Sequence, residues 1–215
     1  HTDDFIPLCN TELLYDFFVA NKYKYVTENA VWFEPAVAKP VSQKKRLASK
    51  KKLFLYGRPN VDRNLFYGAI KALDLALLDD ALNGIEFEIY SAGQSDLPTL
   101  KLHSGTYIEN LGKMSYADYY DFAQSVDVAI SPMLAPHPNY PTLELASIGA
   151  MVVTTKYETK QNLDRYCANI IMSDPDIVSL SKSIVKAVLT DESKRFANVK
   201  ASRILKGWPD AVEPA

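Results

Sequence analysis

Apolar positions along the chain fall into short blocks that predict strands and helices in alternation. The expected strands are apolar at nearly every position rather than at every second one, which is typical of a parallel sheet covered on both faces. The stretch 64–82 between two of them has apolar residues at helical spacing. The pattern predicts an α/β fold, a doubly wound parallel, Rossmann-like sheet with closing helices after Asp176. The expected strands are 53–56, 87–93, a third that closes at 109–112, 126–132, 151–155 and 169–173.

The N-terminal stretch has a different character. Apolar residues at helical spacing predict a helix within residues 9–23, with Asn10 or Thr11 as its N-cap. The segment AVWFEP then predicts a strand that ends at Pro35. These elements are too few for a domain of their own.

A basic segment separates the two parts. Residues 39–52 carry seven Lys and Arg side chains and almost no apolar ones. We interpret them as a solvated linker; the alternative is a patch for peripheral membrane contact, because each Lys or Arg gains about 1 kcal/mol near anionic lipid. Either interpretation divides the chain into 1–38, the linker 39–52, a binding domain over 53–192, and a closing helix and tail over 193–215.

Charge and motif content exclude several classes of function. The net charge of −2 and the pI of about 6.0 argue against a nucleic-acid partner. Neither a Gly-x-Gly-x-x-Gly nor a Walker lysine loop occurs. No group of acidic or histidine residues is interpreted as a divalent-ion site, so neither a metal nor a cofactor is expected.

The loop after the first predicted strand of the sheet carries candidate anion-binding residues. In YGRPNVDRN, Gly57 permits a sharp turn, and Arg58 and Arg63 stand just before a helix. Guanidinium groups and the amides of a helix N-terminus are both suited to holding a diphosphate. The alternative is that one arginine pairs with Asp62 or another surface carboxylate.

A second informative loop spans residues 131–150. Its prolines make it a rigid frame, and a helix is expected to begin at Thr142 or Leu143, with amides that could contact a phosphate. Glu144 could accept hydrogen bonds from both hydroxyls of a ribose; alternatively it only compensates the helix dipole. On composition alone, His137 would be a packed or surface loop histidine.

These segments, with the motifs GRPxxxRN and PHPxYPxLE, resemble the C-terminal, donor-binding domain of a GT-B glycosyltransferase. The resemblance is to family 4 and is greatest to bacterial rhamnosyltransferases of surface polysaccharide synthesis, from about residue 53 to the last strand. It implies that residues 1–38 are the end of a partner N-terminal domain. One departure is Pro136, where many retaining members carry a glutamate, so the sugar and the stereochemical outcome stay open.

The resemblance also implies roles for individual residues. Arg58 and Arg63 would neutralise the diphosphate, and Glu144 would bind the ribose. The other expected site residues are Ser91 and Gly93 beneath the nucleotide, Lys113 and Tyr116 near the base, Tyr140, Thr142 and Leu143 at the phosphate, and Gly57, Asn64 and His137, of which His137 is the catalytic candidate.

The implied function is transfer of a sugar from a nucleotide-diphosphate donor, expected to be dTDP-L-rhamnose, to a polysaccharide or lipid-linked glycan acceptor. The implied location is cytoplasmic, at or near the inner face of the cell membrane. This chain alone is expected to bind donor without turnover, because the acceptor site would belong to the N-terminal domain. The alternatives are a non-catalytic Rossmann-like interaction module and, last, a sugar-nucleotide epimerase.

Overall fold

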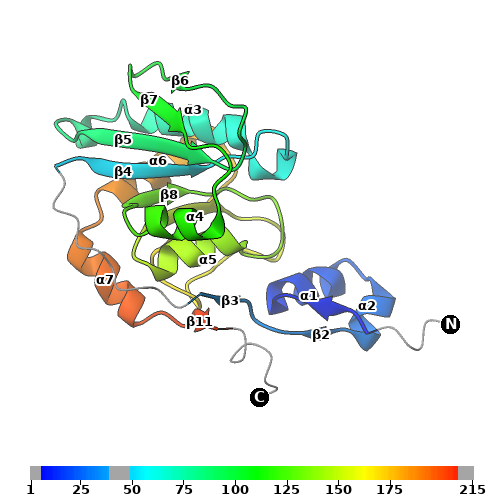
Figure 1. The fold of residues 1–215 in the computed structure, drawn as a ribbon. Coiled ribbons are helices and arrows are strands. Elements are labelled where there is room, and N and C mark those ends of the chain that lie inside the picture. Colours follow the sequence, from blue (N-terminus) through cyan, green and yellow to red (C-terminus); the bar gives the residue numbers. More distant parts are fainter. Residues whose placement is uncertain (1–5, 39–48, 208–215) are drawn as a thin grey trace.

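The computed structural model describes residues 6–38 and 49–207. Its centre is a seven-stranded sheet of order β10-β9-β8-β4-β5-β7-β6 (Figure 1). All neighbours pair in parallel except β6 and β7, so the predicted parallel α/β sheet is confirmed. The strands are β4 (Lys51–Tyr56), β5 (Phe87–Ala92), β6 (Leu100–Lys101), β7 (Tyr107–Asn110), β8 (Val128–Ile130), β9 (Met151–Thr155) and β10 (Ile170–Ser173).

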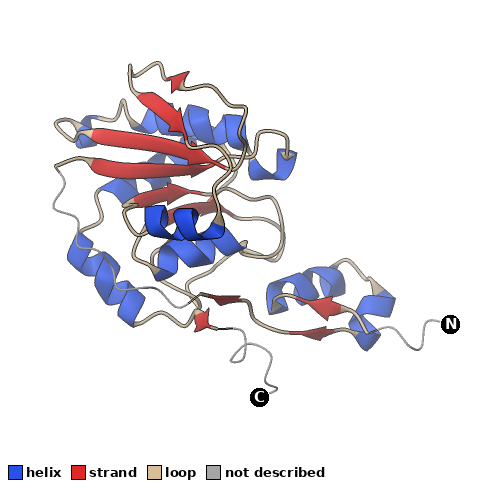
Figure 2. Ribbon diagram, in the orientation of Figure 1, coloured by secondary structure: helices blue, strands red, loops and turns tan. Residues whose placement is uncertain are grey.

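Helices cover both faces of this sheet (Figures 1 and 2). Leu53 and Leu55 of β4 belong to the core under α3 and α6, whereas Phe54 belongs to the core under α4 and α5. Alternate side chains of one strand thus serve two cores, which explains why the strand is apolar throughout. The helices are α3 (Phe66–Ala76), α4 (Tyr116–Ala123), α5 (Tyr140–Ser147), α6 (Ile177–Val188) and α7 (Glu192–Lys200), with 3₁₀ turns at Asp62–Asn64 and Asp80–Leu82.

The N-terminal elements form a small separate layer. The hydroxyl of Thr11 accepts a hydrogen bond from the amide of Leu14 at 3.0 Å, so Thr11 is the N-cap of α1. The strand that the sequence predicts up to Pro35 is shorter than expected, and a second strand that was not predicted follows Pro35. The elements are β1 (Leu8–Cys9), α1 (Glu12–Ala20), α2 (Lys24–Asn29), β2 (Val31–Trp32) and β3 (Ala36–Val37).

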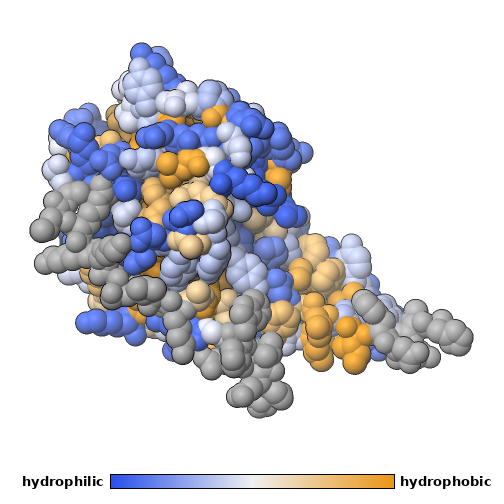
Figure 3. Space-filling view, viewed as in Figure 1, coloured by the Kyte–Doolittle hydropathy of each residue, from blue (hydrophilic) through white to orange (hydrophobic). Residues whose placement is uncertain are grey.

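Side-chain and strand contacts attach this layer to the α/β domain. Strand β3 pairs in parallel with β11 (Leu205–Lys206), which follows the closing helices. The Tyr120 hydroxyl donates to the carbonyl of Ala38 at 2.8 Å, and Thr159 donates to the carbonyl of Leu13 at 2.9 Å. An orange area lies over this layer in Figure 3. The large hydrophobic side chains that stay exposed on the layer are Ile6, Leu8, Val19, Tyr23, Val31 and Trp32.

Two expected boundaries need correction. Strand β4 begins at Lys51, so Lys51 and Lys52 belong to the sheet and not to the linker. The strand includes them because it pairs with β5 from Lys51 onward. Residues 39–48 of the expected linker lie outside the described residues.

The helix expected over 64–82 ends at Ala76, and Leu78, expected near its inner face, is 57% exposed. No helix in the described ranges is long and apolar enough to cross a bilayer.

A buried ion pair joins the closing helix α7 to the sheet. The Arg195 guanidinium donates to Asp127 Oδ1 at 2.9 Å and to the carbonyls of Asp127 and Gly149 at 3.0 and 3.2 Å. The other carboxylate oxygen of Asp127 accepts from the amide of Lys52 in β4 at 2.8 Å. Helix α7, strand β4 and the start of β8 are therefore held by one network.

Replacing this arginine should destabilise the whole domain. Arg195→Ala leaves the Asp127 carboxylate partly buried without its cation, which costs about 3–5 kcal/mol. Urea unfolding followed by circular dichroism should show this loss. The matched control is Lys194→Ala on the exposed side of the same helix, which should change stability by less than about 0.5 kcal/mol. Equal effects of the two substitutions would contradict the role given to the network.

Candidate functional site

A cavity of about 650 Å³ opens beyond the carboxyl ends of β4 and β5, beside the N-terminal turns of α4 and α5. Ligands of doubly wound sheets bind at this edge. Of the residues predicted from sequence, the cavity brings together Arg58, Gly93, Lys113, Tyr116, Tyr140 and Glu144. Its other lining residues are Phe54, Tyr56, Ala92, Gln94, Ser95, Asp96, Met114, Ser115, Tyr119 and Pro141.

Two glycines allow the loops beneath the cavity to lie against each other. The amide of Gly57 donates to the carbonyl of Ala92 at 2.9 Å. A Cβ on Gly93, whose φ is +129°, would lie 2.5 Å from the carbonyl oxygen of Gly57, and a Cβ on Gly57 would lie 2.7 Å from the Phe66 ring. A larger residue at position 93 would push the two strand ends apart, and one at position 57 would displace the Phe66 ring.

The cationic groups of the cavity are available to an anion. Arg58 and Lys113 are both exposed at its rim. Neither forms an ion pair with any residue that the structure describes, so the alternative pairing of Arg58 with Asp62 is not formed. Two cations without carboxylate partners make this wall of the cavity attractive to phosphate groups.

Glu144 is the buried acidic group of the cavity, whereas Asp96, which also lines it, is exposed. Glu144 lies in α5, only 9% exposed, and burial raises its pKa, a rise that the Tyr119 hydroxyl partly opposes. Burial and the charge of Glu144 in turn raise the pKa of Tyr116 and, more strongly, of Tyr119. The free energy that a carboxylate gains by compensating the dipole of α5 is well below the free-energy cost of burying it. Dipole compensation therefore does not explain why Glu144 is buried here.

Helix α5 begins at Tyr140, earlier than the predicted Thr142 or Leu143. Asn139 is its N-cap and has a left-handed φ of +59°. The Thr142 amide donates to Asn139 Oδ1 at 2.8 Å, and the Leu143 amide donates to the Asn139 carbonyl at 3.5 Å. The cap thus already uses both amides, and the expected phosphate contact from them stays a prediction.

The other predicted residues lie outside the cavity lining. His137 faces a narrow hollow shared with Asn10 and Thr11, and its Nδ1 accepts from the amide of Asn139 at 3.1 Å. Burial, then the charges of Lys160 and Arg63, lower the pKa of His137, so a neutral imidazole is expected at pH 7.

Three other predicted residues lie near the strand ends but do not line the cavity. Arg63 is exposed, and its carbonyl accepts from the amide of Leu134 at 2.7 Å. The Ser91 hydroxyl is buried and donates to Asn110 Oδ1 at 3.4 Å. Asn64 is buried, and its Oδ1 has no partner within the described ranges.

Sequence reasoning missed two residues in this region. Tyr119 lies within a predicted helix whose tyrosines give no signal to distinguish one from another. Lys160 follows β9 in a polar loop and is fully buried, with its Nζ donating to the carbonyl of Met133 at 2.8 Å. A lysine in a polar stretch reads as exposed, so only the folded chain identifies it. Burial lowers the pKa of Lys160 to about 7.

No group of three or more metal-ligating side chains occurs within 6–38 and 49–207. An Asp-x-Asp pair does stand after β10, but both of its carboxylates have structural roles. Asp174 accepts from Lys156 Nζ at 3.0 Å, and Asp176 caps α6 by accepting from the amide of Ser179 at 2.9 Å.

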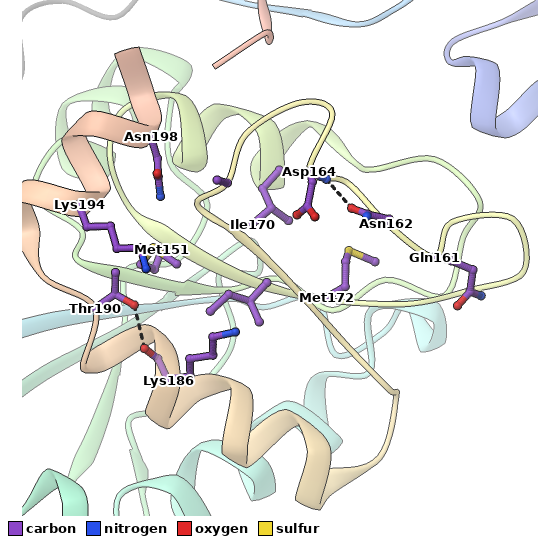
Figure 4. Close-up of a pocket in the computed structure, with 12 residues that line it drawn as sticks. Met151, Gln161, Asn162, Asp164, Ile170, Met172, Lys186, Thr190, Lys194 and Asn198 are labelled. Carbon is purple, nitrogen blue, oxygen red and sulfur yellow. Dashed lines mark hydrogen bonds between the residues drawn. The ribbon is translucent and has the colours of Figure 1, made fainter. Parts of the chain in front are cut away.

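A second groove, of about 420 Å³, lies away from these residues (Figure 4). It runs along the edge strand β10, between the loop that carries Gln161 and Asn162 and the helices that carry Lys186 and Lys194. None of the predicted site residues lines it, so the cavity at the strand ends remains the candidate site.

Solved structures share this fold. A glycosyltransferase from Rickettsia africae matches with a TM-score of 0.65 at 13% identity, over 91% of this chain and 58% of that one. Alr3699/HepE from Anabaena, solved in complex with UDP and glucose, matches with a TM-score of 0.65 at 15% identity, over 93% and 58%. WaaG, involved in lipopolysaccharide biosynthesis, matches with a TM-score of 0.65 at 17% identity, over 91% and 56%. The fold and the site define the C-terminal domain of a GT-B glycosyltransferase.

Sequence comparison gives the family. Residues 51–185 match the model of the WsaF C-terminal domain, and the chain belongs to this family. A curated relative, the O-antigen biosynthesis protein RfbC of Myxococcus xanthus, is 31% identical over 173 residues, which are 80% of this chain and 13% of RfbC. The chain thus spans a small part of RfbC and little more than half of the solved structures. The resemblance to a GT-B donor domain is confirmed, and the sugar stays a prediction.

The buried Lys160 should make stability depend on pH. Its pKa is about 7 in the folded chain against an ordinary 10.5. Between these values the unfolded chain holds a proton that the folded chain lacks, so the free energy of unfolding should rise with pH. The rise, absent from Lys160→Met, should reach at most about 1.4 kcal/mol per pH unit. Urea unfolding at pH 7, 8 and 9 measures it.

The matched control is Lys182→Met, at an exposed position on α6. Its stability should follow that of the unchanged chain across the same pH range. If Lys160→Met also ran parallel to the unchanged chain, the ammonium of Lys160 would not be buried in the way described.

Proposed function

We propose that the chain binds a nucleotide-diphosphate sugar, dTDP-L-rhamnose, as the donor half of a glycosyltransferase that extends a cell-surface polysaccharide or lipid-linked glycan. The observation that carries the proposal is one cavity with unpaired cations at its rim, Arg58 and Lys113, and a buried carboxylate, Glu144. In a nucleoside diphosphate, the anionic phosphates would complement these cations, and the sugar hydroxyls would complement the carboxylate.

In this scheme Arg58 stabilises the negative charge that develops on the diphosphate as the bond to the sugar breaks. Glu144 accepts hydrogen bonds from the nucleoside sugar and orients the donor. Tyr116, in the first turn of α4, provides an aromatic surface near the base. Because the amides of Thr142 and Leu143 are already bonded to Asn139, side-chain cations supply most of the leaving-group stabilisation, without a metal ion or cofactor.

The comparisons support the general kind of donor. HepE was solved with UDP and glucose, and RfbC is named for O-antigen biosynthesis. The comparisons do not identify the base or the sugar of the donor. The proposal of thymine and rhamnose comes from the sequence resemblance. A location at the cytoplasmic face of the membrane belongs to the same proposal, because nucleotide sugars are substrates there.

Calorimetric titration with dTDP, UDP and GDP tests the function and the base together. We expect binding to all or some of them, strongest for dTDP. Arg58→Glu removes a charge-assisted contact and places a repelling carboxylate beside the diphosphate, so dTDP affinity should fall by about 30-fold or more. Lys182→Glu on exposed α6 makes the same change in net charge and should leave affinity unchanged.

The outcomes separate the alternatives. Preference for UDP or GDP would keep a transferase donor site with another sugar. No binding of any nucleotide by a folded sample would favour a non-catalytic interaction module of a glycan-assembly protein. If the Arg58→Glu variant bound dTDP normally, the diphosphate would have to bind elsewhere than at the rim of this cavity.

A further inference from the structure

The outer edge of the central sheet faces the second groove. Strand β10 is the terminal strand of the sheet, and no strand of the described ranges pairs with its far side. Three consecutive residues of β10, Ile170, Ile171 and Met172, line the groove. Ile170 and Met172 pack in one core and Ile171 packs in the other. The feature that all three share toward the groove is therefore the backbone edge of the strand.

Three backbone groups of this edge are open. The carbonyl of Ser173 accepts from the amide of Lys156, which directly follows β9, at 2.8 Å, so Ser173 turns its backbone toward β9. Because this direction alternates along a strand, Ile170 and Met172 turn their backbone groups toward the groove. The Ile170 amide already donates to the carbonyl of Cys167 at 3.1 Å. The Ile170 carbonyl and both backbone groups of Met172 are left for a further strand.

The walls on the two sides of this edge differ in charge (Figure 4). Lys186 of α6 and Lys194 of α7 are exposed, and neither forms an ion pair with any residue that the structure describes. The other wall is a loop that contributes Gln161, Asn162 and a single acid, Asp164. The helical wall is therefore attractive to carboxylates, whereas the loop wall is polar and weakly acidic.

The walls also lie over opposite faces of the sheet. Helix α6 packs in the core that receives Ile171, whereas Leu163 of the loop packs in the core that receives Ile170. A strand added to β10 would alternate its side chains between the same two faces. Every second side chain of such a strand would point toward the wall of Lys186, and the side chains between them would point toward the wall of Asp164.

A second copy of this chain fits this edge poorly. When two copies pair their edge strands in antiparallel fashion about a twofold axis, the same faces of the two sheets lie side by side. Lys186 would then meet its own counterpart, and lysines beside a sheet edge oppose pairing of this kind. A strand with carboxylates on that face would be attracted by the same lysines. Charge complementarity therefore favours an acidic partner over self-association.

We propose that β10 and its groove are a docking site for an extended segment of a partner protein that carries acidic residues at every second position. The segment adds a strand to the sheet. The open backbone groups of Ile170 and Met172 hold its main chain, and Lys186 and Lys194 bind its carboxylates. The groove shares no lining residue with the cavity at the strand ends, so the inference goes beyond the proposed function and does not depend on it.

NMR titration of the ¹⁵N-labelled 215-residue chain with synthetic peptides tests the docking site. The probes are (Glu-Thr)₃ and, with opposite charge, (Lys-Thr)₃. We expect (Glu-Thr)₃ to shift the amide signals of Ile171 and Met172 with a Kd of about 1 mM or below, and to bind about tenfold more tightly than (Lys-Thr)₃. Methylation of every backbone nitrogen of (Glu-Thr)₃ keeps its carboxylates and removes its main-chain donors, so binding should be lost.

Charge reversal on α6 supplies the matched pair of variants. Lys186→Glu replaces an attractive group of the groove by a repelling one, so the affinity for (Glu-Thr)₃ should fall about tenfold or more. Lys182→Glu makes the same change in net charge at an exposed position of the same helix outside the groove, and it should change the affinity by less than about twofold. Both substitutions are at exposed positions, so circular dichroism should show an unchanged fold.

Several outcomes would overturn the proposal. They are the absence of β10 shifts at about 5 mM (Glu-Thr)₃, equal binding of the two peptides, and equal effects of the two substitutions. Binding that survives methylation would show attraction of charge without strand addition, and a dimer in solution that pairs through β10 would show that a second copy covers the edge. No nucleotide takes part in these measurements, so each of these results would leave the proposed function standing.

Discussion

Strand β4 is the element on which both the fold and the site depend. Its side chains alternate between two cores, Leu53 and Leu55 on one face and Phe54 on the other, so a shift by one residue would move each set into the wrong core. Its end is fixed as tightly, because Gly57 meets the backbone of Gly93 from the neighbouring strand. The position of the cavity follows from these two constraints: Arg58 comes directly after the fixed strand end, and Tyr119 and Glu144 stand on the helices that pack over Phe54.

Buried charged groups in this domain differ in how they are satisfied, and the difference separates structure from function. Arg195 forms an ion pair with Asp127 and hydrogen bonds to two carbonyls, so its charge is satisfied within the fold. Lys160 has a carbonyl partner and a pKa lowered to about 7, so it can remain buried by losing its charge. Glu144 forms no ion pair with any of the described residues, and the Tyr119 hydroxyl only partly opposes the rise that burial causes in its pKa. A buried acid left in this state beside unpaired cations is the mark of a site that awaits a ligand.

Much of the fold could be predicted from sequence, because buried parallel strands leave a pattern that does not depend on distant contacts. Arg58, Gly93 and Glu144 were also predictable, since strand ends and helix starts can be located approximately and meet at one edge of the sheet. The start of α5 was placed late because Asn139 adopts a left-handed conformation that lets it cap the helix before Pro141. Burial of Lys160 and of the Tyr119 hydroxyl depends on how loops and helices pack, and no local pattern carries that information.

The capping of α5 has a consequence for how a diphosphate could be held. In a site that uses helix amides, positive charge is shared by several fixed backbone groups and survives single side-chain substitutions. Here the Thr142 and Leu143 amides donate to Asn139, so the positive potential comes from the flexible side chains of Arg58 and Lys113. Flexible cations lose side-chain entropy when they bind. The less exposed groups, Glu144 and Tyr119, line the same cavity and would meet the nucleoside in the proposed donor site. Selectivity among donors should therefore arise where the site is rigid, at the nucleoside, while the exposed cations contribute affinity that any diphosphate would share.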